Sequence, residues 1–161
     1  MDSELIIRQM LTSDMDRLKQ IIDASFPRFF RFFASHSLDS EGQVLVSEAH
    51  GTAVGFAKLV EFHVGGDKFG CILWLAVHPQ FRRKGIASAL VNTGTELLKH
   101  NGARAVFASA QRRNIVSLAF FSMQGFRKMG FLGLWRLFGW RIFEFYRDIW
   151  FAPGEIVLMH N

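Results

Sequence analysis

Cysteine is almost absent from this sequence, and several other features are missing from it. Cys71 is the only cysteine, so the chain cannot form an internal disulfide, and we interpret this residue as a small buried apolar side chain. The first residues are acidic and no apolar segment follows them, which predicts a cytoplasmic protein without a secretory signal. No linker, repeat or low-complexity segment interrupts the 161 residues. We therefore expect one domain over residues 1–161, and no metal is expected.

The sequence also lacks an uncharged apolar run that is long enough to cross a bilayer. Charged residues interrupt its most hydrophobic stretch, residues 131–151, and a membrane span needs roughly 20 mostly apolar residues. No transmembrane segment is expected. The net charge of +5 suits an anionic ligand and is also compatible with nucleic acid. Nucleic acid is the weaker hypothesis, because the basic cluster Arg82 to Lys84 fits a smaller anion.

Hydrophobic periodicity predicts strands and helices along the whole chain. Apolar residues at helical spacing after Ser13 predict a first helix that Pro27 interrupts. The stretch Phe26–Phe33, rich in phenylalanine and arginine, is interpreted as a second short helix or a lid. Gly65 and Gly66 predict a hairpin turn. The expected strands cover residues 5–8, 43–50, 52–64, 69–77, 104–110 and 155–159.

The segment from Trp74 to Leu90, WLAVHPQFRRKGIASAL, is the most informative part of the chain. The apolar run Trp74–Val77 is typical of a buried strand, and Pro79 ends it because proline has no N–H to donate. From Gly85 the apolar spacing becomes helical. The segment therefore predicts a strand joined to a helix by a basic turn.

This turn has the properties of a phosphate-binding site. The first amides of a helix have no intrahelical partner and the helix dipole is positive there, so backbone donors can hold an anion. Arg82, Arg83 and Lys84 would add positive charge. Gly85 and Ala87 are small enough to let a phosphate approach the main chain closely.

The flanking residues make the match more specific. Val77-x-Pro-x-x-Arg-x-x-Gly-Ile-Ala-x-x-Leu90 resembles the acyl-CoA-binding motif of the GCN5-related N-acetyltransferases, the GNAT superfamily. The segment from Asn114 to Phe126 resembles the next helix of that family, which opens with an asparagine that contacts the cofactor and closes with Gly-Phe. The resemblance covers the chain from about Leu5 to Met159, although the N-terminal half matches only in its order of elements.

The resemblance implies an α+β fold with a central mixed, mostly antiparallel sheet of six or seven strands, flanked by helices and splayed between the fourth and fifth strands. It implies an acetyl-CoA-dependent N-acetyltransferase in which an amine acceptor attacks the thioester directly. The alternative is an acyl-CoA-binding sensor or partner module with little turnover. The cofactor-binding positions that the resemblance implies are Leu75, Ala76, Val77, Arg82, Arg83, Lys84, Gly85, Ile86, Ala87, Ser88, Asn114 and Phe121.

The catalytic residues are less clear from the sequence. A main-chain N–H near Leu75 is expected to bind the developing oxyanion. The segments where many relatives carry a glutamate base contain no carboxylate, so Glu61 and His63 are the candidate bases, the first because burial can raise a glutamate pKa toward neutrality. They are equally well explained as solvent-facing residues of an edge strand. The family often places a tyrosine acid where this chain has Phe121, and the only tyrosine, Tyr146, is interpreted mainly as a packing residue.

The C-terminal stretch departs from the family pattern. Five apolar residues are spaced as one face of a helix: Leu134, Phe138, Ile142, Phe145 and Ile149. The first interpretation is a helix packed on its own sheet or on a second subunit, as in a homodimer. The alternatives are a helix on a membrane surface or a wall of a hydrophobic acceptor pocket.

Overall fold

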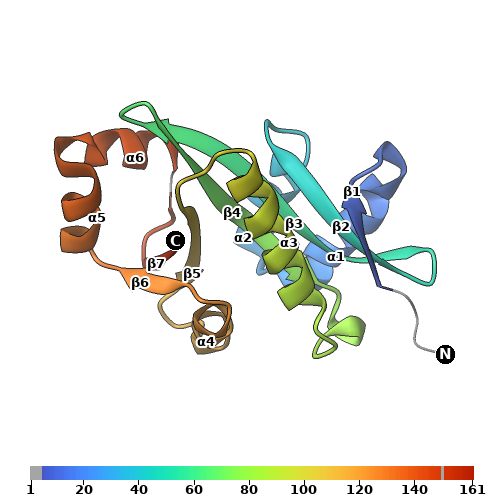
Figure 1. Cartoon of the computed structure of the whole chain (residues 1–161). Helices are drawn as coiled ribbons and strands as arrows, with labels where there is room; N and C mark the ends of the chain where they lie inside the picture. Colours follow the sequence, from blue (N-terminus) through green and yellow to red (C-terminus); the bar gives the residue numbers. More distant parts are fainter. Residues whose placement is uncertain (1–4, 150) are drawn as a thin grey trace. The chain divides into compact units, whose positions relative to one another are not determined.

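The structure, a computed structural model, describes residues 5–149 and 151–161 (Figure 1). Its strands are β1 (Ile6–Gln9), β2 (Gln43–Ala49), β3 (Thr52–Val64), β4 (Asp67–Val77), β5 (Val106–Gln111), β6 (Arg127–Met129) and β7 (Glu155–His160). Its α-helices are α1 (Met15–Ser25), α2 (Arg28–Ser37), α3 (Ile86–His100), α4 (Ile115–Met123), α5 (Phe131–Phe138) and α6 (Ile142–Asp148). Short 3-10 helices are η1 (Thr12–Asp14), η2 (Pro79–Phe81) and η3 (Gly139–Arg141).

The seven strands of the described residues form one mixed sheet in the order β1-β2-β3-β4-β5-β7-β6. Four neighbouring pairs, β1 with β2, β2 with β3, β5 with β7 and β6 with β7, are antiparallel. β4 and β5 are parallel. The expected α+β fold with a mixed, mostly antiparallel sheet is confirmed, and the strand predicted at residues 52–64 has the same bounds as β3.

β4 and β5 are paired over a short stretch only. Gly70–Ile72 lie opposite Val106–Ala108, and among the described residues no β5 partner follows Ile72, although β4 continues to Val77. Leu73–Leu75 are half-buried, which is unusual for the middle of a central strand. The expected splay between the fourth and fifth strands is therefore confirmed.

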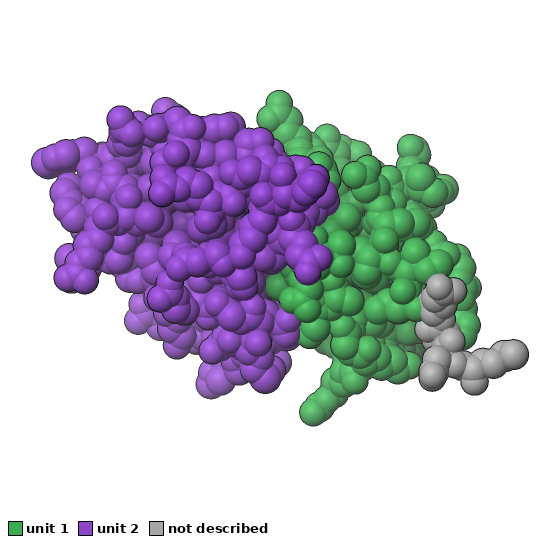
Figure 2. Space-filling view, viewed as in Figure 1, with its two compact units in different colours: residues 1–60, 73–94 green, residues 61–72, 95–161 purple. Residues whose placement is uncertain are grey.

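The chain divides into two compact units (Figure 2). Unit 1 contains residues 1–60 and 73–94, and unit 2 contains residues 61–72 and 95–161. Three elements, β3, β4 and α3, run through both units. The expectation of a single domain over the whole chain stays a prediction.

In unit 1, helices cover both faces of the strands (Figure 1). Val44 and Val46 of β2 pack in one buried cluster with Leu18 of α1. Leu45 points to the opposite face because side chains alternate along a strand, and it lies near Gly94 of α3. Pro27 separates α1 from α2 and stands just before the first turn of α2, where its missing N–H removes no helical bond. The predicted second short helix is α2.

Unit 2 has an aromatic core. Phe107 of β5 lies 5.0 Å from Phe145 of α6 and 6.0 Å from Phe62 of β3, measured between ring centroids. Phe69 of β4 lies 5.2 Å from Phe138 of α5. Such edge-to-face and tilted ring pairs add stability beyond the area they bury. The C-terminal helices thus pack on their own sheet, as the first interpretation of that stretch expected.

The continuous helix suggested by the spacing in the C-terminal stretch is not formed. The helix is interrupted at Gly139, whose φ of 56° and ψ of −135° belong to a conformation that residues with a side chain avoid. The apolar face is nevertheless retained, because Leu134, Ile142 and Phe145 are each no more than 1% exposed. The spacing predicted the buried face correctly, and a single glycine divided it between α5 and α6.

A buried ion-pair network fixes the start of the chain against unit 1. Arg8 donates to both carboxylate oxygens of Asp14, at 2.7 and 2.9 Å, and to Glu48 at 2.7 Å. Asp14 also accepts the N–H of Leu11 at 2.8 Å. The hydrogen bond from Arg8 lowers the pKa of Asp14 below its ordinary value, although burial opposes the shift.

We expect Asp14→Asn to reduce the free energy of unfolding by about 1–3 kcal/mol near pH 7, because Arg8 loses its charged partner. A carboxylate with a lowered folded-state pKa contributes stability above its unfolded pKa and loses it as pH falls through the folded pKa. The difference between variant and wild type should therefore shrink when urea unfolding is repeated near pH 3. A difference that stays constant with pH would contradict the role of the charge.

Candidate active site

The loop between β4 and α3 is held by its own polar groups. The N–H of Gln80 donates to Nδ1 of His78 at 3.4 Å, so His78 caps η2. Nε of Arg82 donates to the carbonyl of Val77 at 2.9 Å, and the hydroxyl of Ser25 approaches the same carbonyl at 3.5 Å. Arg82 thereby ties the loop to the end of β4 while its guanidinium stays exposed.

The loop enters α3 through two residues in the left-handed region, Arg83 at φ 63° and Gly85 at φ 76°. The carbonyl of Gly85 accepts the N–H of Ala89 at 3.0 Å, so the helix begins directly after Gly85. A Cβ built on Gly85 would meet no atom within 4 Å, which means that the space in front of this turn is open. A helix start that faces open space beside exposed basic residues fits an anionic phosphate group.

The predicted cofactor-binding residues of this segment differ in exposure. Arg82, Arg83, Lys84 and Gly85 are exposed, Leu75, Ala87 and Ser88 are half-buried, and Ala76, Val77 and Ile86 are buried. Ile86 anchors the first turn of α3 in the core, 5% exposed. The remaining members of the segment border solvent or lie at the end of β4, where a ligand can reach the main chain.

The direction of the β4 amides changes once along the strand. The N–H of Gly70 donates to the carbonyl of Ala105, next to β5, at 3.0 Å, whereas the N–H of His78 donates to Val54 of β3 at 2.8 Å. In a regular strand these two residues would face the same neighbour, because hydrogen-bonding direction alternates with a period of two. The hydrogen-bonding direction therefore reverses between Gly70 and His78, in the part of β4 that contains Leu75 and has no β5 partner among the described residues.

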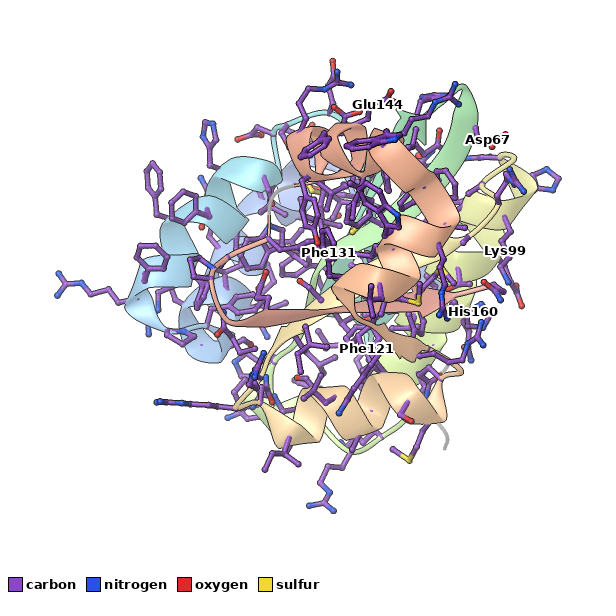
Figure 3. All side chains as sticks on the ribbon, turned by 90° about the vertical axis from the view of Figure 1, so that its left-hand side faces the viewer. Asp67, Lys99, Phe121, Phe131, Glu144 and His160 are labelled. Carbon is purple, nitrogen blue, oxygen red and sulfur yellow. The ribbon has the colours of Figure 1, made fainter. Side chains whose placement is uncertain are left out.

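Asn114 begins α4 in unit 2. Its side-chain oxygen accepts the N–H of Ser117 at 3.1 Å, and its own N–H donates to the carbonyl of Gln111 at 2.8 Å. Asn114 is therefore the N-cap of this helix, and its cofactor contact stays a prediction. Phe121 is 5% exposed and lies 5.2 Å from Phe126 between ring centroids, in the layer between α4 and the strands β6 and β7 (Figure 3).

Comparison with known proteins identifies the family of this chain. The sequence profile of the Acetyltransferase (GNAT) family matches residues 7–126, a range that holds the basic loop, Asn114 and Phe121. The chain belongs to the GNAT family of acetyltransferases. A search of curated proteins finds no match.

Solved structures with the GNAT fold are similar to this chain over most of its length. An acetyltransferase of the family from Desulfovibrio desulfuricans has a TM-score of 0.75 at 16% identity and covers 97% of this chain and 98% of its own. The PaiA N-acetyltransferase from Thermoplasma acidophilum, in complex with coenzyme A, has a TM-score of 0.71 at 14% identity, covering 98% and 99%. The chain also spans 18% of a fungal multi-domain β-N-acetylglucosaminidase, whose glucosamine N-acetyltransferase region it resembles at 19% identity and a TM-score of 0.68 over 80% of this chain. At these identities the likeness shows the fold alone.

The surroundings of Glu61 do not favour the role of a general base. Glu61 is exposed, accepts a hydrogen bond from Asn101 at 2.9 Å and lies 3.2 Å from the ammonium of Lys68. The Asn101 bond, with further help from Lys68, lowers its pKa, so the expectation that burial would raise it is wrong. Lys68 precedes the paired part of β4 and Leu75 follows it, so Glu61 lies beside the other end of that strand. His63 lies on β3, like Glu61, and is exposed as well. A base role for Glu61 or His63 stays a prediction.

Sequence reasoning did not single out Glu155, the first residue of β7. It lies opposite Gln111, beyond the last residue of β5 that pairs with β4. Burial raises its pKa, partly offset by the N–H of Ala152, which donates to the carboxylate at 2.8 Å, and by the hydroxyl of Ser109. No local signal in the sequence could have found it, because only the strand order places the start of β7 beside the end of β5.

The remaining candidates are structural. Cys71 is fully buried, and burial, followed by the charge of Glu155, raises its pKa to about 12, which agrees with the interpretation of an inert apolar residue. Tyr146 is 39% exposed, so it is not the buried packing residue that its spacing suggested. Its hydroxyl belongs to the outer side of α6.

We expect Asn114→Asp to retain the melting temperature of the wild type, since aspartate caps helices as well as asparagine does. The same change should weaken acetyl-CoA binding by about tenfold or more, because an amide donor is replaced by a negative charge. Calorimetric titration measures the affinity, and Asn114→Ala, which loses the cap, is the control for stability. Unchanged affinity of Asn114→Asp would exclude Asn114 as a cofactor contact.

Proposed function

We propose that this protein transfers an acetyl group from acetyl-CoA to the primary amine of an acceptor. The observation that carries the proposal is the open, left-handed Gly85 at the start of α3, next to Arg82, Arg83 and Lys84. Membership of the GNAT family supports it, as does the coenzyme A in the structure of PaiA N-acetyltransferase. The cytoplasmic location expected from the sequence belongs to the same proposal.

In the proposed reaction the amine nitrogen attacks the thioester carbon, the C–S bond breaks, and coenzyme A leaves as a thiolate. The main-chain N–H of Leu75 would donate to the oxyanion, because Leu75 lies in the part of β4 that has no β5 partner among the described residues. The thiolate then takes a proton from water. A dedicated acid is not needed for a thiol with a pKa of about 8.5, and the buried Phe121 cannot supply one.

Glu155 is the base that we propose for the amine. Its half-buried carboxylate has a raised pKa, which brings it closer to the neutral range where a general base works best. It shares one face of the sheet with Ser109 and Phe107, since paired and alternate residues of neighbouring strands point the same way. Gly70 turns the opposite face toward Leu98 of α3.

Binding of acetyl-CoA is tested by a matched pair of variants at Gly85. Asparagine tolerates the left-handed conformation, and aspartate has nearly the same shape with a negative charge. We expect Gly85→Asp to bind acetyl-CoA at least about tenfold more weakly than Gly85→Asn, with a gap that narrows as salt is added. Equal affinities in calorimetric titration of the two folded variants would refute the phosphate site.

The proposed base is tested by the pH profile of turnover, followed through release of free thiol with a panel of amines. We expect Glu155→Gln to lower kcat by about 10²-fold and to remove the rise of the rate with pH through the glutamate pKa, while acetyl-CoA affinity is retained. Glu61→Gln is the matched control and should leave the profile unchanged. The reverse result would return the base role to Glu61.

The same assay distinguishes an enzyme from a binding module. Trp74, which precedes Leu75, lies 5.3 and 6.3 Å from Phe26 and Phe30 between ring centroids, so the panel includes amines that carry an apolar group. Tight acetyl-CoA binding without thiol release for any amine in the panel, arylalkylamines included, would favour the alternative of a sensor or partner module.

A further inference from the structure

The helices α5 and α6, which follow β6 and precede β7 in the sequence, carry large apolar residues on their buried and on their exposed sides. Their inner side contributes Leu134, Ile142 and Phe145 to the core of unit 2. Their outer side leaves large apolar residues in solvent: Phe131 60%, Leu132 70%, Leu137 44%, Trp140 79%, Phe143 67% and Tyr146 39% exposed. We call these six residues the α5–α6 face; Figure 3 labels one of them, Phe131. Exposed large apolar side chains gathered on one short segment often mark a binding surface.

The charges around the α5–α6 face are mostly positive. Arg136, Arg141 and Arg147 are exposed on the same segment, and Arg127 and Lys128 of the preceding strand β6 are exposed as well. The two acidic groups of the segment are engaged. Glu144 accepts the N–H of Gly65 at 2.8 Å, and Asp148 accepts Nε of Arg147 at 2.7 Å, so Asp148 balances the charge of Arg147. Arg141 donates to the carbonyl of Gly65 at 3.1 Å and keeps its positive charge. A partner of this face therefore has to offer negative charge together with apolar depth.

We propose that the α5–α6 face binds the surface of an anionic lipid bilayer. Tryptophan, phenylalanine and leucine side chains enter the boundary between headgroups and acyl chains, and interspersed arginines pair with anionic headgroups. Among the described residues no helix is long and apolar enough to traverse a bilayer, so the contact is with the surface. A second copy of this chain is the less suitable partner, because its face carries the same excess of positive charge.

The contact is tested with vesicles and needs no acetyl-CoA, so its outcome is separate from that of the proposed activity. We expect wild-type protein to co-sediment with phosphatidylcholine vesicles that contain about 30% phosphatidylserine, less with phosphatidylcholine alone, and less as salt is added. The double variant Trp140→Ser/Phe143→Ser should lose at least about tenfold in binding. Arg136→Glu/Arg147→Glu should remove the preference for anionic lipid.

The matched control removes exposed apolar residues elsewhere in unit 2. Val116 and Met123 of α4 are 82% and 77% exposed, so Val116→Ser/Met123→Ser should bind vesicles like the wild type. Circular dichroism verifies that each variant is folded. The proposal is overturned if folded wild-type protein does not sediment with anionic vesicles, or if Trp140→Ser/Phe143→Ser binds as well as the wild type. It is also overturned if light scattering shows a dimer that the same variant dissociates, because a second copy then covers the face.

Discussion

Parallel pairing between β4 and β5 ends at Ile72, and the candidate active site depends on this limit. A fully paired central strand would direct every amide and carbonyl into the sheet ladder and leave none for a ligand. The reversal of hydrogen-bonding direction between Gly70 and His78 instead falls in the stretch of β4 that contains Leu75 and has no β5 partner among the described residues. The half-buried side chains of Leu73–Leu75 are a second sign of the same opening.

The end of β4, the basic loop and the start of α3 form one continuous segment of the candidate site. Arg82 holds the carbonyl of Val77, so the basic loop stays attached to the strand whose main chain is exposed. The left-handed turn at Arg83 and Gly85 then directs the chain into α3 without a side chain in front of the first helical amides. The groups that we propose to bind the phosphate and the thioester of acetyl-CoA thus lie only a few residues apart. This explains why so short a segment carries the family resemblance.

The C-terminal helices show how a local interruption changes the use of an apolar sequence. Gly139 divides the predicted helix, and both halves keep their buried residues against the aromatic core. The residues left over are too apolar to be ordinary surface and too interspersed with arginine to be core. Their composition is the reason why we propose a membrane surface as the partner of the outer side of α5 and α6.

Part of the candidate site was predictable from the sequence, because its residues are close neighbours along the chain. The basic residues and the glycine that bind an anion at the start of α3 are neighbours along the chain, and their conformations follow from short-range sterics. The same is true of the bounds of β3 and of the short helix α2 after Pro27. A raised pKa at Glu61 was expected from burial, but Glu61 is exposed and its neighbours Asn101 and Lys68 lower its pKa.

The tertiary structure decided what depends on pairing between distant segments. Glu155 is far from Gln111 in sequence, and only the insertion of β7 between β5 and β6 brings a half-buried carboxylate to the end of β5. The outer side of α5 and α6 likewise became identifiable only when the aromatic core had selected which residues to bury. Sequence periodicity determines which residues share a face, whereas the free energy of packing that face against distant strands determines which neighbours it meets and what is left exposed.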